Sequence, residues 1–185
     1  MPEKVELFIF CGLIASGKST LAEAWAGKLE ASYYNSDRIR KELAGLQAKA
    51  PQRESFNAGI YTPEFSRRTY DRLLSLAETD LKLGKTVVLD GSYQARHERD
   101  RVRELGRRMG KALKFVLCGC SDKVTKERLA VRANDPEAVS DGRWEIYLQQ
   151  KRHFSRYDEP GAELINLSTE APVAELLDRL SAGVF

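Results

Sequence analysis

The sequence predicts an α/β fold with a mostly parallel sheet, and three observations support this prediction. Short apolar runs alternate with helical patterns along the chain. Three of these runs are almost continuously apolar, as expected of parallel strands covered on both faces. The chain has 185 residues, of which 42% are hydrophobic and 31% charged, so it fits one soluble domain with a buried core. We therefore expect residues 1–185 to form a single domain.

The expected elements follow from periodicity and from the residues that start and stop them. Strands are expected at residues 5–11, 32–35, 86–90, 113–118 and 163–167. Helices are expected at residues 18–30, 37–46, 63–83, 94–109 and 172–182, with two more between 121 and 153. The long helix has the clearest start, because Thr62 can serve as its N-cap and Pro63 suits its first position.

The segment CGLIASGKST directly follows the first strand and opens the first helix. Residues 12–19 match the phosphate-loop pattern G-x-x-x-x-G-K-[ST] at every fixed position, a match expected by chance on the order of 10⁻⁵–10⁻⁴ per position. Glycines let backbone N–H groups approach phosphate oxygens, and the helix N-terminus adds its dipole. We expect Lys18 to reach the β- and γ-phosphates and the Ser19 hydroxyl to bind Mg²⁺. The predicted nucleotide-binding residues are Gly12, Ala15, Ser16, Gly17, Lys18, Ser19 and Thr20.

The loop alone does not separate a kinase from other nucleotide-binding proteins. The guanine motif N-K-x-D is absent, as is the transporter signature L-S-G-G-Q. A small kinase and a stand-alone ATPase remain, with ATP and Mg²⁺ as the expected cofactors.

Asp37 and Arg40 follow the second strand. In such folds, ligands bind outside the carboxyl ends of the strands, so this segment should face the same crevice as the phosphate loop. A carboxylate there can orient an acceptor hydroxyl toward the γ-phosphate, which makes Asp37 the candidate base. Arg40 lies one turn further and could hold the substrate. The alternative is that Ser36 or Asp37 is simply a helix N-cap.

Asp90 ends the third strand, in the position of a Walker B carboxylate. Such a carboxylate is suited to a Mg²⁺-bound water or to a substrate group, so Asp90 is a candidate for both metal and substrate contact. The alternative is an ordinary strand-end aspartate that caps the turn at Gly91-Ser92.

Arg128 and Arg132 are the candidate lid arginines. At positions i and i+4 they share one face of an expected helix, so both could contact the transferring phosphoryl group. We place the lid at about residues 121–145. The alternative is an exposed helix in which Glu127 pairs with an arginine.

Together these features resemble a group of small P-loop kinases. This group includes the kinase domain of 5′-hydroxyl polynucleotide kinases, chloramphenicol phosphotransferase, gluconate kinase and, most similar, a set of bacterial "predicted kinase" proteins. The resemblance covers nearly the whole chain and rests on residues 12–20, 36–40, 60–64, 88–93 and 128–132, followed by Ser140-Asp141. It implies a three-layer P-loop NTPase fold, a five-stranded parallel sheet of order 2-3-1-4-5, and a helical lid. It also implies that Asp37 is the general base, Arg40 the substrate-side arginine and Arg132 the lid arginine.

We therefore expect an ATP-dependent kinase that transfers the γ-phosphate to a hydroxyl of a small-molecule acceptor. The alternatives are a polynucleotide 5′-hydroxyl kinase and a non-kinase ATPase switch module. The net charge is only +3, which does not argue for nucleic acid. An arginine stripe on the fourth helix fits a solvated face better than a phosphate-tracking groove; its members are Arg96, Arg99, Arg103 and Arg107.

The expected location is the cytoplasm. The odd number of cysteines, three, suggests reduced thiols. The first residues resemble a strand rather than a signal peptide, and no apolar run approaches 18 residues, so we expect no membrane partner.

Overall fold

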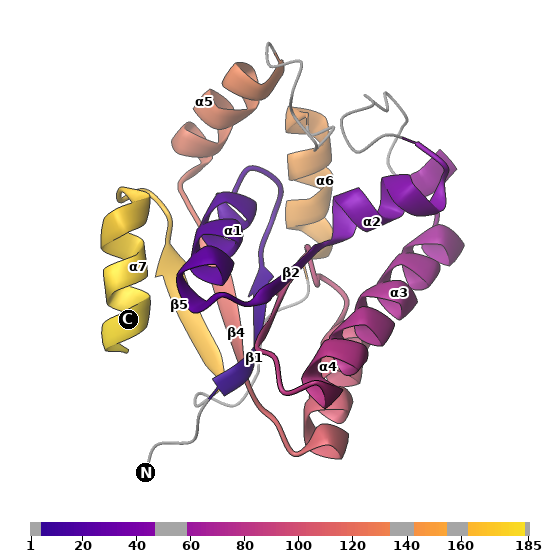
Figure 1. The fold of residues 1–185 in the computed structure, drawn as a ribbon. Helices are drawn as coiled ribbons and strands as arrows, with labels where there is room; N and C mark the ends of the chain where they lie inside the picture. Colours follow the sequence, from indigo (N-terminus) through magenta and orange to yellow (C-terminus); the bar gives the residue numbers. More distant parts are fainter. Residues whose placement is uncertain (1–4, 47–58, 134–142, 155–162, 184–185) are drawn as a thin grey trace.

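A five-stranded parallel sheet runs through the middle of the molecule, in the strand order β2-β3-β1-β4-β5 (Figure 1). The computed structural model describes residues 5–46, 59–133, 143–154 and 163–183. Its strands are β1 (Val5–Cys11), β2 (Ser32–Asn35), β3 (Val87–Asp90), β4 (Ala112–Gly119) and β5 (Leu164–Ser168), and every paired neighbour is parallel. The α/β prediction and the strand order implied by the resemblance are confirmed.

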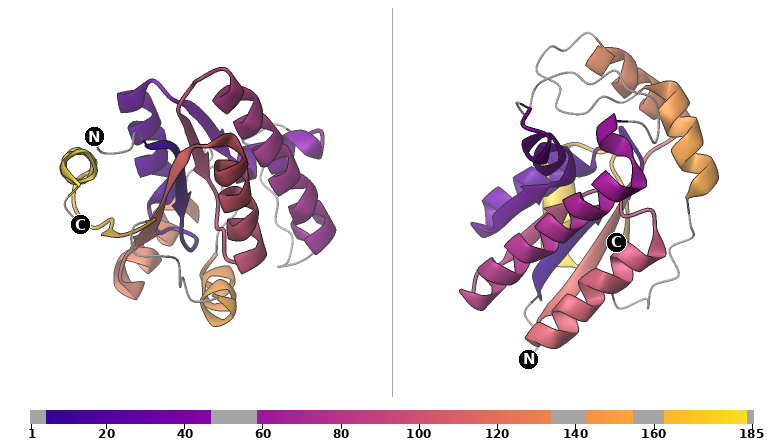
Figure 2. Two further views of the ribbon diagram at one scale, coloured as in Figure 1. Left: turned by 90° about the horizontal axis from the view of Figure 1, so that it is seen from below. Right: turned by 90° about the vertical axis from the view of Figure 1, so that its right-hand side faces the viewer.

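Helices cover both faces of the sheet and make it the middle of three layers (Figures 1 and 2). One face packs against α1 (Lys18–Leu29) and α7 (Val173–Ala182), with a core that includes Phe10, Trp25 and Leu176. The other face packs against α3 (Pro63–Lys82) and α4 (Arg96–Met109). Burial of these apolar side chains is the main source of stability for the sandwich.

The remaining helices lie at the end of the molecule where the strands terminate (Figure 1). They are α2 (Ser36–Leu43), the short 3₁₀ helix η1 (Gly59–Tyr61), α5 (Asp122–Ala133) and α6 (Trp144–His153). Leu129 of α5 and Tyr147 of α6 pack on Ile14 and Ala15 in a small separate apolar cluster. The two helices therefore pack against the loop that follows β1. The predicted lid, residues 121–145, includes α5 and the start of α6, while residues 134–142 lie outside the described part.

Most helix boundaries agree with the local signals in the sequence. Thr62 caps α3 as predicted, since its side chain accepts a hydrogen bond from the Phe65 N–H at 3.3 Å. The prediction for α2 was wrong at its end, because the helix stops at Leu43 rather than at Leu46. Gly45 adopts φ +70°, and the N–H groups of Gly45 and Leu46 bond back to carbonyls of the last turn. This glycine-terminated arrangement ends the helix before Leu46 can join it.

The arginine stripe on α4 is not one exposed face. Arg99 is fully buried, and its guanidinium donates to the carbonyls of Tyr93 and Gln94 at 3.0 and 2.9 Å, so it holds the turn between β3 and α4. Arg103 bonds Asp100 at 2.7 Å and Glu163 at 3.0 Å. Arg107 bonds the neighbouring Glu104, as expected of a solvated face.

The cysteines agree with the expectation of free thiols, since Cys11, Cys118 and Cys120 form no disulfide. Within the segments described above, no helix combines the length and apolar character needed to cross a membrane.

Candidate active site

The phosphate loop connects β1 to α1, and its two fixed glycines are required by close packing. Gly12 has φ +139°, and a Cβ there would lie 2.3 Å from the Cys118 carbonyl oxygen. Gly17 is the N-cap of α1 at φ +82°, and a Cβ there would lie 2.9 Å from Thr169 Oγ1. A side chain at Gly12 would clash with backbone, and one at Gly17 would adopt a strained left-handed conformation and displace the side chains of Thr169 and Arg128. The loop is held in the shape that the sequence motif predicts.

Lys18 and Ser19 are the first two residues of α1. The Lys18 ammonium reaches back to the Leu13 carbonyl at 3.5 Å, so it lies across the loop that the motif assigns to phosphates. The Ser16 Oγ is buried and has no hydrogen-bond partner among the described residues. An orphaned hydroxyl beside a helix N-terminus fits a loop built to receive an anion.

The sheet register places the candidate acidic residues beside this loop. In the parallel ladders, Asp90 of β3 pairs with Phe10 of β1 on one side and with Asn35 of β2 on the other. The loop begins two residues after Phe10, and Asp37 follows two residues after Asn35. Adjacent strands lie about 4.8 Å apart, so the ends of three neighbouring strands bring these groups to one crevice.

Asp37 lies in the first turn of α2. Asp37 is partly buried, and the loss of water around its carboxyl raises the pKa of Asp37. The charges of Lys18, Arg40 and Lys41 act in the opposite direction and lower that pKa, and the Asp90 carboxylate raises it further. These four charged residues therefore lie within electrostatic reach of Asp37. The N-cap of α2 is Asn35 rather than Ser36 or Asp37, so the carboxylate of Asp37 is not used as the cap.

Asp90 is completely buried, and its two carboxylate oxygens have different surroundings. Oδ2 accepts hydrogen bonds from the Tyr33 hydroxyl at 2.8 Å and from the Asn35 amide at 2.5 Å. Oδ1 has no hydrogen-bond partner among the described residues. A buried carboxylate oxygen without a donor is costly unless a ligand or cation completes it.

This orphaned oxygen fits the predicted Mg²⁺ ligand role. In nucleotide sites Mg²⁺ usually takes one or two protein oxygens and fills its shell with water and phosphate oxygens. Ser19 at the loop and Asp90 at the end of β3 offer such oxygens. In the described part of the chain, no group of three or more acidic, histidine or cysteine side chains is placed to hold a metal without a nucleotide.

Arg40 is 7% exposed and is held by η1 and by the first turn of α3. Its Nη1 donates to the Ile60 carbonyl at 2.7 Å and to the Ser66 hydroxyl at 3.1 Å, and its guanidinium lies 5.1 Å from the centre of the Tyr61 ring. The structure thus brings Arg40 near Asp37 but ties part of its guanidinium to protein. Its substrate role stays a prediction.

Arg128 contacts the outer side of the phosphate loop. Its guanidinium donates to the Ala15 carbonyl at 3.3 Å, and to the hydroxyl and carbonyl of Thr169 at 3.0 and 2.5 Å. The Thr169 hydroxyl in turn donates to the Ser16 carbonyl at 2.5 Å. Arg132 lies one turn further, in the last turn of α5. Arg128, one of the two predicted lid arginines, therefore joins α5 to the loop.

A family model described as an AAA domain, AAA_33, matches residues 7–157. The chain belongs to this family. The matched segment includes the phosphate loop, Asp37, Asp90 and both candidate lid arginines. No curated protein matches the chain.

Solved structures similar to this AAA_33 chain include three kinases. A sugar kinase from Janibacter sp. HTCC2649 has a TM-score of 0.69 at 18% identity, with 97% of this chain and 94% of that chain covered. A gluconokinase from Sinorhizobium meliloti 1021 has a TM-score of 0.64 at 20% identity, with 97% and 91% covered. The Mycobacterium tuberculosis APS kinase CysC in complex with AMPPNP and APS has a TM-score of 0.64 at 18% identity, with 98% of both covered. The AAA_33 chain thus has the fold of P-loop kinases.

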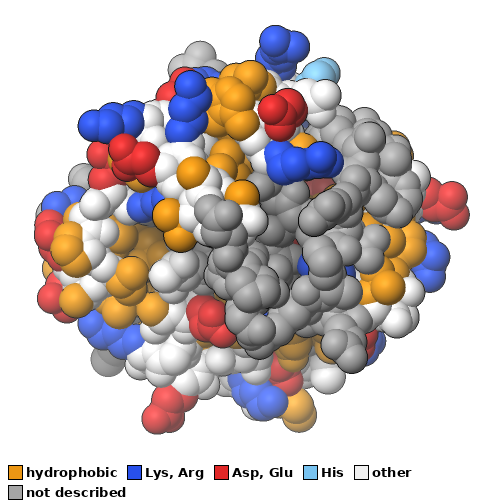
Figure 3. Space-filling view, turned by 90° about the horizontal axis from the view of Figure 1, so that it is seen from above, with side chains coloured by type: hydrophobic (Ala, Val, Ile, Leu, Met, Phe, Trp, Pro, Cys, Tyr) orange, Lys and Arg blue, Asp and Glu red, His pale blue; other side chains and the backbone are white. Residues whose placement is uncertain are grey.

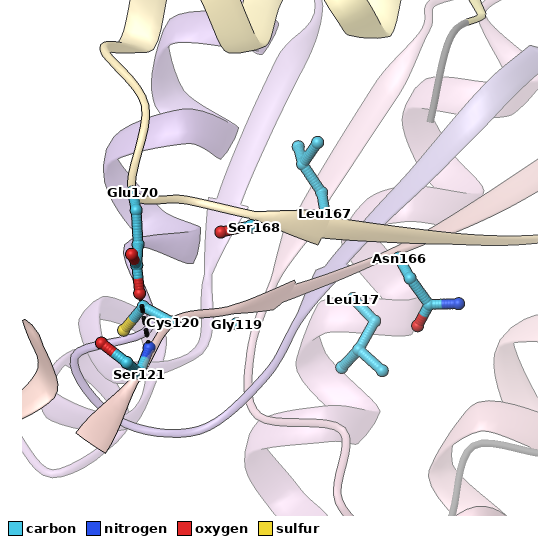
Figure 4. Close-up of a pocket in the computed structure, with 8 residues that line it drawn as sticks. All are labelled: Leu117, Gly119, Cys120, Ser121, Asn166, Leu167, Ser168 and Glu170. Carbon is cyan, nitrogen blue, oxygen red and sulfur yellow. Dashed lines mark hydrogen bonds between the residues drawn. The ribbon is translucent and has the colours of Figure 1, made fainter. Parts of the chain in front are cut away.

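A hollow of about 400 Å³ opens between the carboxyl ends of β4 and β5 (Figure 4). Its lining includes Cys120, Asn166 and Glu170, and Glu170 accepts a hydrogen bond from the Ser121 N–H at 2.7 Å. Neither Lys18, Asp37 nor Asp90 lines it. The hollow therefore lies beside the candidate site of this AAA_33 protein rather than over its acidic pair.

Four polar residues that contact the site were not predicted from the sequence of this AAA_33 protein. Tyr33 and Asn35 hold Asp90, Thr169 holds the loop carbonyl, and Gln150 of α6 accepts a hydrogen bond from the Ile14 N–H at 2.9 Å. The sequence did contain one signal for Tyr33 and Asn35. They are two residues apart, so their side chains lie on the same face of a strand that ends beside the predicted acidic residues.

Proposed function

We propose that this protein is an ATP-dependent kinase that transfers the γ-phosphoryl group to a hydroxyl of a small molecule. The observation that carries the proposal is the position of Asp37. Its carboxylate lies within electrostatic reach of Lys18 on the donor side and of Asp90, at the ends of adjacent strands. A carboxylate in this position can orient an acceptor hydroxyl toward the γ-phosphate and accept its proton, which supports phosphoryl transfer.

Each residue of the candidate site has a separate role in the proposed phosphoryl transfer. Loop amides and Lys18 bind the β- and γ-phosphates. Asp37 accepts the proton of the acceptor hydroxyl while that oxygen forms its bond to the γ-phosphorus. The bond from phosphorus to the bridging oxygen breaks, and ADP leaves with the electron pair. Arg128 and Arg132 belong to the element proposed to close over the phosphates and exclude water.

Ser19 and Asp90 are the residues that would hold Mg²⁺, with Asp90 using its unpartnered Oδ1. The cation would neutralise charge on the phosphate oxygens. This assignment uses oxygen ligands only, in agreement with the preference of Mg²⁺.

A small acceptor is favoured over a polynucleotide end. The four arginines that could have tracked a nucleic acid backbone all have partners in the protein: Arg99 donates to backbone carbonyls, and Arg96, Arg103 and Arg107 pair with carboxylates. Seen from above the lid end, basic and acidic side chains are interspersed with apolar ones rather than gathered by sign (Figure 3). Two of the similar structures carry names that specify a sugar or gluconate as substrate. Nucleic acid binding would instead require a continuous basic surface.

The direct test is to incubate the protein with γ-labelled ATP, Mg²⁺ and separate panels of sugars and sugar acids, nucleosides, aminoglycosides and 5′-hydroxyl oligonucleotides. Transfer of label to a small molecule is the expected result. Transfer to the oligonucleotides would establish the polynucleotide alternative. ATP hydrolysis that no addition changes, with no labelled product, would contradict kinase function and favour the switch module.

A further inference from the structure

The side-chain amide of Asn35 connects Asp90 with the first turn of α2, where Asp37 lies. Its Oδ1 accepts a hydrogen bond from the Arg38 N–H at 2.9 Å and thereby caps α2, the helix that carries Asp37 in its first turn. Its Nδ2 donates to Asp90 Oδ2 at 2.5 Å. One buried side chain thus connects the start of α2 to the end of β3.

Tyr33 contributes a second donor to the same oxygen. Tyr33 and Asn35 are two residues apart on β2, so their side chains lie on the same face of the sheet. The Tyr33 hydroxyl donates a hydrogen bond to Asp90 Oδ2 at 2.8 Å. Asp90 Oδ2 therefore has two donors, both from β2.

Both donors contact Oδ2, and neither contacts Oδ1. Oδ1 is buried, and none of the described residues is its hydrogen-bond partner. A carboxylate held by two donors at one oxygen cannot rotate without losing both bonds, so the direction of the other oxygen is set by β2.

We propose that Asn35, assisted by Tyr33, is a positioning residue that locks the Asp90 carboxylate to the start of α2, so that Oδ1 of Asp90 is presented to the nucleotide-bound cation at a fixed relation to Asp37. The proposal rests on the function proposed above, in which Asp90 is a cation ligand. Asn35 and Tyr33 act through Asp90 and touch neither nucleotide nor acceptor.

The structure offers two small substitutions that separate this role from a general structural one. Asn35→Ser keeps a good N-cap for α2 but removes the amide that reaches Asp90. Tyr33→Phe removes only the hydroxyl. Each has a matched control on the same sheet: Asn166→Ser changes an exposed asparagine of β5, and Tyr34→Phe removes a hydroxyl that bonds Asp80 instead of Asp90.

The experiment measures binding of Mn²⁺, as a paramagnetic substitute for Mg²⁺, to the protein saturated with the non-hydrolysable analogue AMPPNP, using electron paramagnetic resonance. Mutation of a residue that hydrogen-bonds a metal ligand typically lowers the affinity for the metal by about 10–100-fold. We therefore expect Asn35→Ser to weaken Mn²⁺ binding about tenfold or more, and Tyr33→Phe to weaken it somewhat less. AMPPNP binding without metal should be unchanged in both variants, and the two controls should bind Mn²⁺ as the wild type does. In an Asp90→Asn background, Asn35→Ser should cause no further loss, because the ligand that it positions is already gone.

Wild-type Mn²⁺ affinity in both folded variants, or an additive loss in the Asp90→Asn background, would overturn the proposal. So would the absence of nucleotide-dependent Mn²⁺ binding in the wild type. Because this measurement involves no acceptor, it separates the two claims. A chain that shows the expected Mn²⁺ losses but phosphorylates nothing would retain Asn35 as a positioning residue and lose the kinase function.

Discussion

Asp37 shows how the requirements of chemistry and of stability conflict at one residue. A base must be ionised to accept a proton, but burial of its carboxyl raises the pKa of Asp37 above its ordinary value of 3.8. The neighbouring cations offset only part of this effect. The ionised carboxylate is therefore destabilising in the nucleotide-free protein, as is common for groups retained for function.

We predict that Asp37→Asn raises the melting temperature at pH 7. The folded protein holds the Asp37 proton more tightly than the unfolded chain does. The stability contribution of Asp37 is thus complete below pH 3.8 and is lost as the pH rises through the folded-state pKa. For a chain of this size, each kcal/mol corresponds to about 2–4 °C. Thermal unfolding followed by circular dichroism measures the change.

The advantage of Asp37→Asn should shrink as the pH is lowered through the folded-state pKa of Asp37 and disappear below pH 3.8, where the Asp37 carboxyl is protonated in the folded and the unfolded chain. Asp178→Asn is the matched control, since Asp178 is 82% exposed and its ion pair with Lys28 is long, at 3.7 Å. A variant that is less stable than the wild type at pH 7 would mean that the attraction of Lys18 and Arg40 exceeds the cost of burying Asp37.

At the scale of elements, the phosphate loop is held from outside by three others. Arg128 of α5 and Gln150 of α6 bond its backbone, and Thr169, which follows β5, bonds the Ser16 carbonyl. These bonds fix the conformation of the loop backbone before a nucleotide binds. The contacts also mean that α5 cannot move without changing its bonds to the loop.

We predict that Thr169→Val weakens nucleotide binding by about 5–30-fold, whereas Thr169→Ser leaves it nearly unchanged. Valine matches threonine in shape but leaves the Ser16 carbonyl and the Arg128 guanidinium each without one partner, at a net cost of about 1–2 kcal/mol. Isothermal titration calorimetry with AMPPNP measures the affinity. Equal binding by the valine and serine variants would show that the hydroxyl does not position the loop.

Elements with strong local signals could be predicted from the sequence, and contacts between distant residues could not. The strands, the Thr62 cap and the phosphate loop depend on neighbouring residues, so the pattern sufficed. The end of α2 was missed because the glycine stop at Gly45 was overlooked in favour of the apolar Leu46. Asn35 and Thr169 were missed for another reason: their partners Asp90 and Ser16 lie 55 and 153 positions away in the sequence.

At the scale of the whole molecule, the strand order is what assembles the site. The order β2-β3-β1 places three carboxyl ends side by side, and these ends carry Asp37, Asp90 and the phosphate loop. Composition and periodicity predicted the parallel sheet, but the order came from the resemblance to known kinases. The role of Arg99 also depends on the packing of the whole molecule. Its place in an arginine-rich helix suggests a surface residue, but in the structure it is buried and supports the turn after β3.

The most direct test of the central claim compares Asp37→Asn with the wild type in two measurements, using an acceptor identified by γ-label transfer. The proposed role predicts that the rate of phosphoryl transfer falls by about 10²–10⁴-fold, the usual contribution of a positioned base. The affinity for AMPPNP and Mg²⁺ should stay within about threefold, because Asp37 is not among the groups assigned to bind the nucleotide. A variant that transfers phosphate at the wild-type rate would contradict the assignment of Asp37 and, with it, the proposed mechanism.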